Sequence, residues 1–463
     1  MAKKYISNTD RLAGLLKGIK LMANPKYSQS QTAPLERCPF SGAENGPTNL
    51  LSEEALQNPY PVYEQLRRDC PVAYLEDQNI WVITRYDDCE YVLTHPEKFS
   101  SREAVSSVNA YRDSSEALAI LAESKARPRA RTLIMSDPPD HDRYRTILQR
   151  CLSPAKTIRQ LTPRMKEVID RLIDSFCERG ECEFVREFAY PLPMLVVAAI
   201  LDVPDEKIDM LKAWSDDFIS VQAGNIPADK VVSAARHTIE FEEWILQRLE
   251  DRRTTPKDDF LGRLVDRPED EAELSTPELV NICLQVLVGG NETTTNFLGN
   301  ALHRLISTPS LIEDLKNEPQ RTGDLIEEIL RAESPLQGLF RVAVDEHDFN
   351  GTIIPKGAKL MLCFGSANRD EKYYGNGRFD PDRDNRETMH MAFGRGIHSC
   401  AGQGFARREG VLALTRILER LPNLSFDPIQ QPERHTLFTI WGMKKLHITF
   451  DPTPKVGTKS TDI

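Results

Sequence analysis

The sequence has no long hydrophobic run: its longest apolar stretch, MLVVAAILDV, is far shorter than a transmembrane helix. A helix that crosses a bilayer needs roughly 20 consecutive apolar residues, so we expect no membrane span. The N-terminal region also lacks the apolar core and the small-residue cleavage site of a secretory signal peptide. Both absences favour a cytoplasmic protein.

Positive charge is also scarce, because 59 Lys and Arg stand against 70 Asp and Glu, which gives a formal net charge of −11. Proteins that bind nucleic acids need a basic surface, so we expect no nucleic-acid partner. No two cysteines form a CxxC pair. The cysteines are odd in number and scattered, which predicts a reduced chain without a disulfide framework; they are Cys38, Cys70, Cys89, Cys151, Cys177, Cys182, Cys283, Cys363 and Cys400.

The order of patterns along the chain predicts one large domain with short extensions. Residues 1–50 read as an N-terminal arm and linker, residues 51–455 carry no internal linker or repeat, and residues 456–463 form a polar tail. Helical patterns dominate, while PVAYLEDQNIWVITRY and EHDFNGTIIPKGAKLMLCFG each read as strands around a turn. We therefore predict a mainly α fold with small β-sheets. The polar stretch 100–132 is a candidate functional loop.

The segment FGRGIHSCAG, residues 393–402, places Cys400 directly before a long helical pattern. The positive end of a helix stabilises a thiolate, and glycines allow a planar group to approach the backbone closely. This environment suits a metal-bound or nucleophilic sulfur. A zinc site is disfavoured because no further ligands stand at suitable spacings, and His398 is poorly placed to serve a cysteine hydrolase. A small buried structural cysteine is the alternative.

A second motif, GGNETT, lies within the helical pattern that begins near Thr276. Each glycine in mid-helix costs roughly 0.8 to 1 kcal/mol relative to alanine, so Gly289 and Gly290 should have a purpose. They could open the helix to a small ligand beside the carboxyl of Glu292 and the hydroxyl of Thr293. The alternative is a glycine-mediated helix crossing with polar flanks.

Two charged pairs stand at helical spacing. Glu328 and Arg331 in EEILRAESP are three residues apart, and His141 and Arg145 in DPPDHDRYR are four apart, so each pair shares one helix face. The second pair is suited to donate to carboxylates. The alternative for both is an ordinary polar helix surface.

Taken in order, DPPDHDRYR, GGNETT, EEILR, FDPDR and HMAFGRGIHSCAG resemble the cytochrome P-450 family of haem-thiolate monooxygenases, of the soluble bacterial kind. The resemblance covers residues 55–452, with the Phe-Gly-x-Gly-x-His-x-Cys-x-Gly pattern of the family at residues 393–402. It implies one helical domain that holds haem b (iron protoporphyrin IX) between the oxygen-side helix, about 276–306, and the cysteine loop. It also implies an enzyme that inserts one oxygen atom of O2 into a hydrophobic small molecule, by hydroxylation or epoxidation.

The resemblance assigns roles residue by residue. Cys400 would be the metal ligand, and Glu292 and Thr293 would be the acid and alcohol that deliver protons during dioxygen chemistry. Cofactor-binding positions would be His141, Arg145, Arg341, Phe393, His398, Cys400 and Gly402. The internal structural network would be Glu328, Arg331 and Arg383. The substrate pocket would include Leu287, Gly289, Gly290, Leu339, Phe340, Leu437 and Phe438.

No flavin, nicotinamide or iron–sulfur segment is recognisable in the sequence. We therefore expect electrons from a separate ferredoxin or flavodoxin with an NAD(P)H-dependent reductase. A basic patch near the cysteine loop would attract such an acidic partner, and its members would be Arg150, Lys156, Arg159, Arg395, Arg407 and Arg408. The alternatives are a peroxide-dependent haem-thiolate enzyme and a noncatalytic haem sensor, neither of which needs Glu292 and Thr293.

Overall fold

A computed structural model describes residues 50–457, apart from positions 103, 105–110, 112, 128–129, 223–227, 270, 272 and 385–387. The expected N-terminal arm, except for Leu50, and positions 458–463 of the expected tail lie outside the described residues. The described part is mainly α-helical and contains one five-stranded sheet and three smaller ones, as predicted. None of its helices could cross a membrane by itself, although one bent pair, Val185–Ile200 with Asp205–Phe218, reaches the necessary length and composition together.

The helices fall into an N-terminal set, a central set and a C-terminal set. The N-terminal set is α2 (Glu53–Gln57), α3 (Tyr60–Asp69), α4 (Tyr86–Thr94), α5 (Ser115–Leu121), α6 (Asp140–Leu152) and α7 (Pro154–Asp174). The central set is α8 (Pro191–Ile200), α9 (Ile208–Gln222), α10 (Ala228–Thr254), α11 (Phe260–Val265), α12 (Thr276–Ser307), α13 (Pro309–Asn317) and α14 (Thr322–Ala332). The C-terminal set is α15 (Phe364–Ala367), α16 (Glu371–Tyr374) and α17 (Gln403–Arg420).

The main sheet has the order β1-β2-β8-β5-β3, in which only β2 and β8 pair in parallel. Its strands are β1 (Val72–Leu75), β2 (Ile80–Ile83), β3 (Phe99–Ser100), β5 (Gly338–Ala343) and β8 (Lys359–Cys363). The smaller sheets comprise β4 (Glu181–Glu183), β6 (His347–Phe349), β7 (Thr352–Ile354), β9 (Ser425–Phe426), β10 (Glu433–Arg434), β11 (Met443–Lys445) and β12 (His447–Thr449).

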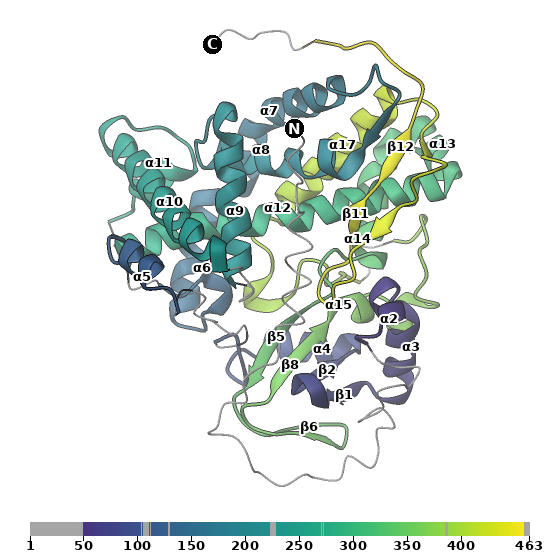
Figure 1. The fold of residues 1–463 in the computed structure, drawn as a ribbon. Helices are drawn as coiled ribbons and strands as arrows, with labels where there is room; N and C mark the ends of the chain where they lie inside the picture. Colours follow the sequence, from purple (N-terminus) through teal and green to yellow (C-terminus); the bar gives the residue numbers. More distant parts are fainter. Residues whose placement is uncertain are drawn as a thin grey trace.

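Figure 1 shows two unequal parts, a large body of helices crossed by α12 and a smaller part in which α2, α3 and α4 surround the main sheet. The largest hydrophobic cluster lies in the helical body and draws residues from α6 through α17. Two smaller clusters lie against the main sheet. The cysteine loop and β5 connect these two parts, so a site built from them can use both.

Local chemistry explains the boundaries that matter for the site. At the start of α12, Ser275 and Glu278 form a capping box with Pro277 in the first turn, which satisfies amide groups that have no partner within the helix. In the β6–β7 hairpin, Asn350 and Gly351 have φ angles of 52° and 91°, as a tight turn of this type requires. The helix start near Thr276 and the turn between the two strands were predicted from the sequence, whereas the capping box was not.

Two expectations need correction. The stretch 100–132 is not wholly a loop, because it contains α5, whose first turn is capped by the Ser114 hydroxyl accepting from the Ala117 N–H. The helix signal was missed because α5 is short and obtains its order by packing on α10. The expectation of a fully reduced chain is wrong at Cys70, which is disulfide-bonded; the free thiols of the described residues are Cys89, Cys151, Cys177, Cys182, Cys283, Cys363 and Cys400.

Candidate functional site

The cysteine loop, residues 393–402, is held in shape by its own backbone. The Cys400 N–H donates to the Phe393 carbonyl at 2.8 Å. Gly394 and Gly396 have φ angles of +67° and +66°, which favour glycine because other residues meet steric strain there. A Cβ on Gly396 would also collide with the Leu93 carbonyl at the end of α4. The glycines therefore set both the turn and its contact with the smaller part of the fold.

The sulfur of Cys400 lies at the N-terminal end of α17. Burial raises the pKa of the thiol above its ordinary value, while the Gly402 N–H, Arg145, Arg407 and the Gln403 N–H act in the opposite direction. The side chain is nevertheless accessible, although much of the protein lies around it. A thiolate in such surroundings is stabilised by a bound cation, and iron is one.

Four basic side chains come together beside the loop: His141 and Arg145 from α6, Arg341 from β5, and His398 from the loop itself. The rings of His141 and His398 are 4.5 Å apart between centres. Burial, then Arg341, His141 and Arg145, lower the pKa of His398 to about 3. Burial also lowers the pKa of Arg341 to about 10. The environment therefore penalises positive charge and favours an anion.

The hydrogen bonds of these groups indicate what kind of anion fits. Arg145 donates to the Ser399 carbonyl at 2.6 Å and Arg341 to the Phe340 carbonyl at 2.7 Å, so both charges rest on neutral acceptors. The Nε2 atom of the buried His141 has no hydrogen-bond partner in the described part of the chain. The two propionate carboxylates of haem are acceptors of the kind this cluster needs. The residues therefore fit haem.

The GGNETT motif lies in the middle of α12. A Cβ on Gly289 would meet nothing within 4 Å, so this glycine opens onto free space, as expected. Gly290 does not share that space, because its Cβ would lie 2.8 Å from Val197 Cγ2 of α8. The glycine therefore serves a close helix crossing, and because it is also partly exposed, its place in the substrate pocket stays a prediction. The Thr293 hydroxyl donates to the Gly289 carbonyl at 3.2 Å.

Glu292 has the electrostatics of a proton donor. Burial, and then the negative charge of Asp216 on α9, raise the pKa of its carboxyl to about 7. Its Oε1 atom is buried without a hydrogen-bond partner in the described part of the chain. A carboxyl with a pKa near neutrality can both hold and release a proton under physiological conditions.

Phe393 is flanked by Arg407, which was expected near the loop, and Arg407 pairs with Glu327, which the sequence did not indicate. The guanidinium carbon of Arg407 lies 4.5 Å from the Phe393 ring centre. Glu327 accepts two hydrogen bonds from Arg407, at 2.6 and 2.8 Å, and lies 3.2 Å from His390 Nε2. Although burial opposes it, bonding by Arg407 and His390 lowers the pKa of Glu327 to about 2. These residues come from separate segments, so no local spacing could reveal them.

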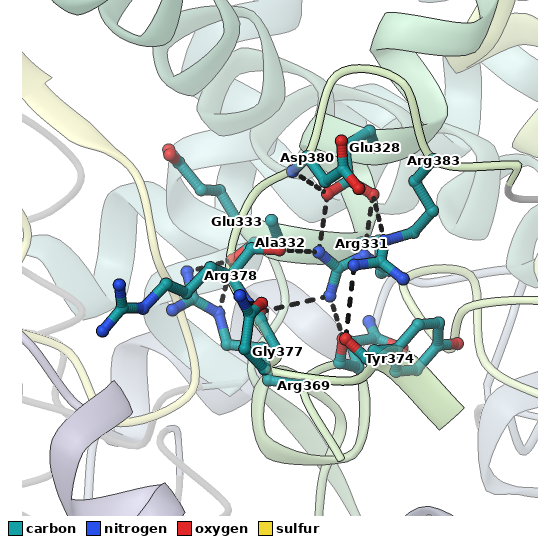
Figure 2. Close-up of polar contacts among 12 residues, drawn as sticks. Glu328, Arg331, Ala332, Glu333, Arg369, Tyr374, Gly377, Arg378, Asp380 and Arg383 are labelled. Carbon is teal, nitrogen blue, oxygen red and sulfur yellow. Dashed lines mark hydrogen bonds and ion pairs between the residues drawn. The ribbon is translucent and has the colours of Figure 1, made fainter. Parts of the chain in front are cut away.

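The predicted pair on α14 forms a buried network. Arg331 donates to both oxygens of Glu328 at 2.7 and 2.6 Å, and the Asp380 N–H donates to Glu328 at 2.8 Å. The Nε atom of Arg383 lies 3.6 Å from the same carboxylate. Figure 2 shows Arg331 reaching from this carboxylate toward the loop that contains Gly377 and Arg378, where it donates to backbone carbonyls. The network therefore fastens α14 to the segment that leads into the cysteine loop.

The other pocket positions are not gathered around one cavity in the described part of the chain. Leu287 is fully buried in the largest hydrophobic cluster, and Phe438 packs in a cluster beside the main sheet. Leu339 and Phe340 are half-buried on β5. Leu437 borders a cavity of about 510 Å³ whose wall also includes His303 and Arg434. Gly289, Gly290, Leu339 and Phe340 are therefore the predicted pocket positions that keep exposed surface.

The expected basic patch is largely neutralised. Arg150 pairs with Glu271 at 2.6 Å, Arg395 with Glu90 at 3.2 Å, and Lys156 with Asp258. Arg407 pairs with Glu327, as described above, and Arg408 donates to the Thr162 hydroxyl at 3.3 Å. The acidic partners lie far away in the sequence, which is why a count of basic residues overstated the charge of this face.

No three His, Cys, Asp or Glu side chains of the described residues come together as a metal site. Cys400 therefore offers a single sulfur to a metal, as a thiolate ligand of haem iron does.

Comparison with known proteins agrees with this geometry. The family model described as Cytochrome P450 matches residues 225–448. Cytochrome P450 107B1 of Saccharopolyspora erythraea is 32% identical over 389 residues, which cover 82% of this chain and 91% of that protein. The vitamin D(3) 25-hydroxylase of Pseudonocardia autotrophica is 33% identical over 386 residues, or 81% of this chain and 90% of the relative.

Solved structures extend the similarity to the fold. The crystal structure of CYP109E1 from Bacillus megaterium in complex with corticosterone superposes with a TM-score of 0.74 at 29% identity, covering 86% of this chain and 100% of the other. The similarity thus includes the helical body, the sheet and the cysteine loop together.

Proposed function

Because the chain belongs to the cytochrome P-450 family, we propose which residues perform the chemistry of a monooxygenase here and on what class of substrate. The chain is an oxidoreductase of this family, and haem b is its cofactor. We assign residues 51–455 to one catalytic domain. A hydrophobic cluster that runs from α6 to α17 supports this assignment.

Cys400 is the ligand of the haem iron in this proposal. The observation that carries it is the accessible sulfur of Cys400 in a glycine-built loop, beside two arginines, Arg145 and Arg341, that donate to backbone carbonyls. His141, Arg145, Arg341 and His398 would bind the propionates, while Phe393 and Gly402 shield and hydrogen-bond the sulfur side. When bound, haem with a thiolate ligand activates dioxygen and favours cleavage of its O–O bond.

Glu292 and Thr293 would supply protons for this chemistry. The raised pKa of Glu292 keeps a proton available near neutral pH, and the adjacent Thr293 hydroxyl can pass it into the space beside Gly289. Gly289 leaves room there because it has no side chain. A dioxygen-dependent enzyme needs such donors, which favours this function over a peroxide-dependent enzyme or a haem sensor.

The substrate would be a hydrophobic small molecule. Gly289, Leu339 and Phe340 offer apolar or neutral surface on α12 and β5, and apolar pockets bind apolar ligands through burial of their surface. The names of two similar proteins, a vitamin D(3) hydroxylase and a protein crystallised with corticosterone, point to the steroid class as the first to examine. Hydroxylation at an unactivated carbon is the reaction we propose.

Electrons would come from a separate ferredoxin or flavodoxin with an NAD(P)H-dependent reductase. Docking near the cysteine loop would rest on Arg159 and Arg408, since the other basic residues expected there are ion-paired. We place the enzyme in the cytoplasm, where NAD(P)H is available to such a reductase.

The ligand assignment is tested by the ferrous carbon monoxide spectrum. Replacing Cys400→His should abolish the strongly red-shifted band of a thiolate-bound haem, whereas Cys283→Ala, which removes a buried thiol from α12, should leave it unchanged. A red-shifted band that survives in Cys400→His would contradict the assignment. Optical titration of the ferric protein with corticosterone then tests the substrate class, because entry of a substrate shifts the haem band to shorter wavelength.

A further inference from the structure

Glu292 does not stand alone between α12 and its neighbours. The negative charge of Asp216, from α9, acts on the Glu292 carboxyl. Asp216 is half-buried and so retains access to solvent. Two carboxyl groups within electrostatic reach cannot both ionise freely, so one of them tends to hold a proton. A proton that Asp216 takes up from solvent can therefore be transferred to the nearby carboxyl group of Glu292.

Tyr190 connects the two acids. Its hydroxyl donates to Asp216 Oδ1 at 3.3 Å. Burial, and then the nearby Asp216, raise the pKa of Tyr190 above its ordinary value; the Asn291 side chain acts in the opposite direction, and the charge of Glu292 adds to the rise. The phenol therefore stays protonated. A neutral hydroxyl can accept a proton on one side while it releases its own on the other.

Asn291 supplies the next polar group. The residue is only 1% exposed, yet neither its side-chain nitrogen nor its oxygen has a hydrogen-bond partner in the described part of the chain. A buried amide of this kind costs free energy unless it is satisfied, and a buried water with polar partners on several sides is the usual solution. The unpartnered Oε1 of Glu292 lies next to it in sequence.

The packing of α8 on α12 encloses this group of residues. Gly290 brings the two helices so close that a Cβ there would press on Val197, and Tyr190 is the residue that directly precedes α8. The close crossing keeps bulk water away from Asn291. Access from solvent is then left to the side where Asp216 lies.

We propose that Asp216, Tyr190 and Asn291 form a proton path from solvent to Glu292, an inference that rests on the proposed function of Glu292. Asp216 takes up a proton and gives it to the Tyr190 oxygen, while the Tyr190 hydroxyl releases its own proton inward to a water bound at Asn291. That water protonates the Glu292 carboxylate. Because the Tyr190 hydroxyl donates to Asp216 at rest, it rotates toward Asn291 before its proton is released inward. The transfer returns Tyr190 and Asp216 to their original states, and Glu292 ends with the added proton.

The test compares Tyr190→Phe and Asp216→Asn with Asp209→Asn, a matched control at an exposed acid on the same helix. The holoenzyme reduces O2 with a plant-type ferredoxin, its reductase and NADPH, and oxygen consumption is followed in H2O and D2O. We expect a loss of roughly 10-fold in both path variants with a larger solvent isotope effect, and a change below about twofold in the control. Turnover driven by hydrogen peroxide, which brings its own protons, should be unchanged in every variant.

A second readout does not depend on turnover. Infrared titration of the ferric holoenzyme follows the protonated carboxyl band that Glu292→Gln removes, and Asp216→Asn should move its midpoint to lower pH because a negative charge is lost. Wild-type rates and isotope effects in both Tyr190→Phe and Asp216→Asn, with Glu292→Gln impaired, would overturn the path and leave the role of Glu292 intact. Wild-type behaviour of Glu292→Gln would instead overturn the proposed function of that residue.

Discussion

Two buried glutamates show how one residue type takes opposite roles in this fold. Glu328 is completely buried, and both of its oxygens accept hydrogen bonds from Arg331, with a backbone N–H and Arg383 alongside. Glu292 has an oxygen without a partner and a second acid nearby. The first carboxylate is fixed by cations, while the second is surrounded by groups that favour its neutral form.

The comparison shows that the charged groups around a buried carboxyl, rather than the extent of its burial, decide whether it is structural or transfers protons. Ion pairing with good geometry stabilises a carboxylate that never changes its charge. Burial next to like charge produces an acid whose protonation changes near neutral pH. The following variants break or sharpen this contrast, in order of decreasing effect.

Removing the ion pair between Glu328 and Arg331 should have the largest effect on stability. Arg331→Ala leaves the carboxylate of Glu328 buried without its main partner, and such a loss costs about 3 to 5 kcal/mol of stability. Guanidinium chloride unfolding, with haem retention measured alongside, provides the value. The control is Glu313→Gln, which removes an exposed partner of Lys316 and should change stability by about 0.5 kcal/mol or less. Equal effects of the two variants would refute the structural role of the network.

Replacing Glu292 by a neutral residue should slow the reaction and leave the fold unchanged. Glu292→Gln keeps the size of the side chain but cannot release a proton, and we expect dioxygen-driven turnover to fall about 100-fold. Thr254→Val, at an exposed hydroxyl at the end of α10, serves as the control and should keep the wild-type rate. A Glu292→Gln enzyme with full dioxygen-driven activity would show that Glu292 is not a proton donor and so does not differ from Glu328 in this way.

The pH dependence of stability should separate the two acids further. Burial and Asp216 raise the pKa of Glu292 from 4.5 to about 7, and Tyr190 is the other titratable group that faces it. Between these values the folded protein holds a proton that the unfolded chain releases, so stability falls as pH rises and then levels off above pH 7. The contribution is about 2 kcal/mol after allowance for partial exposure, and Glu292→Gln should remove it from unfolding curves measured between pH 4.5 and 8. Parallel curves for the two proteins would contradict this prediction.

The two glycines beside Glu292 provide the smallest and most local test. Gly289→Ala adds a methyl group to open space and should stabilise α12 by about 0.8 to 1 kcal/mol. Gly290→Ala presses on Val197 of α8, so it should be less stable than Gly289→Ala by about 1 to 3 kcal/mol. Thermal unfolding of both variants measures the difference. Equal midpoints would mean that α8 and α12 are not in close contact at Gly290.

The sequence predicted features that local spacing determines. The bounds of α12 followed from its helical pattern, the β6–β7 hairpin from Asn350 and Gly351, and the Glu328–Arg331 pair from its three-residue separation. The glycines of the cysteine loop, by their number and spacing, indicated a backbone that another group can approach closely. In each case the interacting groups are close in the chain, so pattern and contact coincide.

The features that were missed depend on contacts between distant segments. Asp216 reaches Glu292 only because α9 packs beside α12, and the pairing of Arg150 with Glu271 depends on a loop more than a hundred residues away. The predicted pocket positions show the same limit of local patterns, since Leu287 and Phe438 lie in different hydrophobic clusters. Periodicity indicates which residues are buried but not which space they face.

The self-bonded cysteine loop also bears on how the enzyme matures in the cell. Because the loop obtains its shape from bonds among its own backbone groups and from the contact of Gly396 with Leu93, the seat for the cofactor is built by the polypeptide itself. Maturation therefore depends on these internal contacts, and a substitution at Gly396 would disturb the seat from the side of α4.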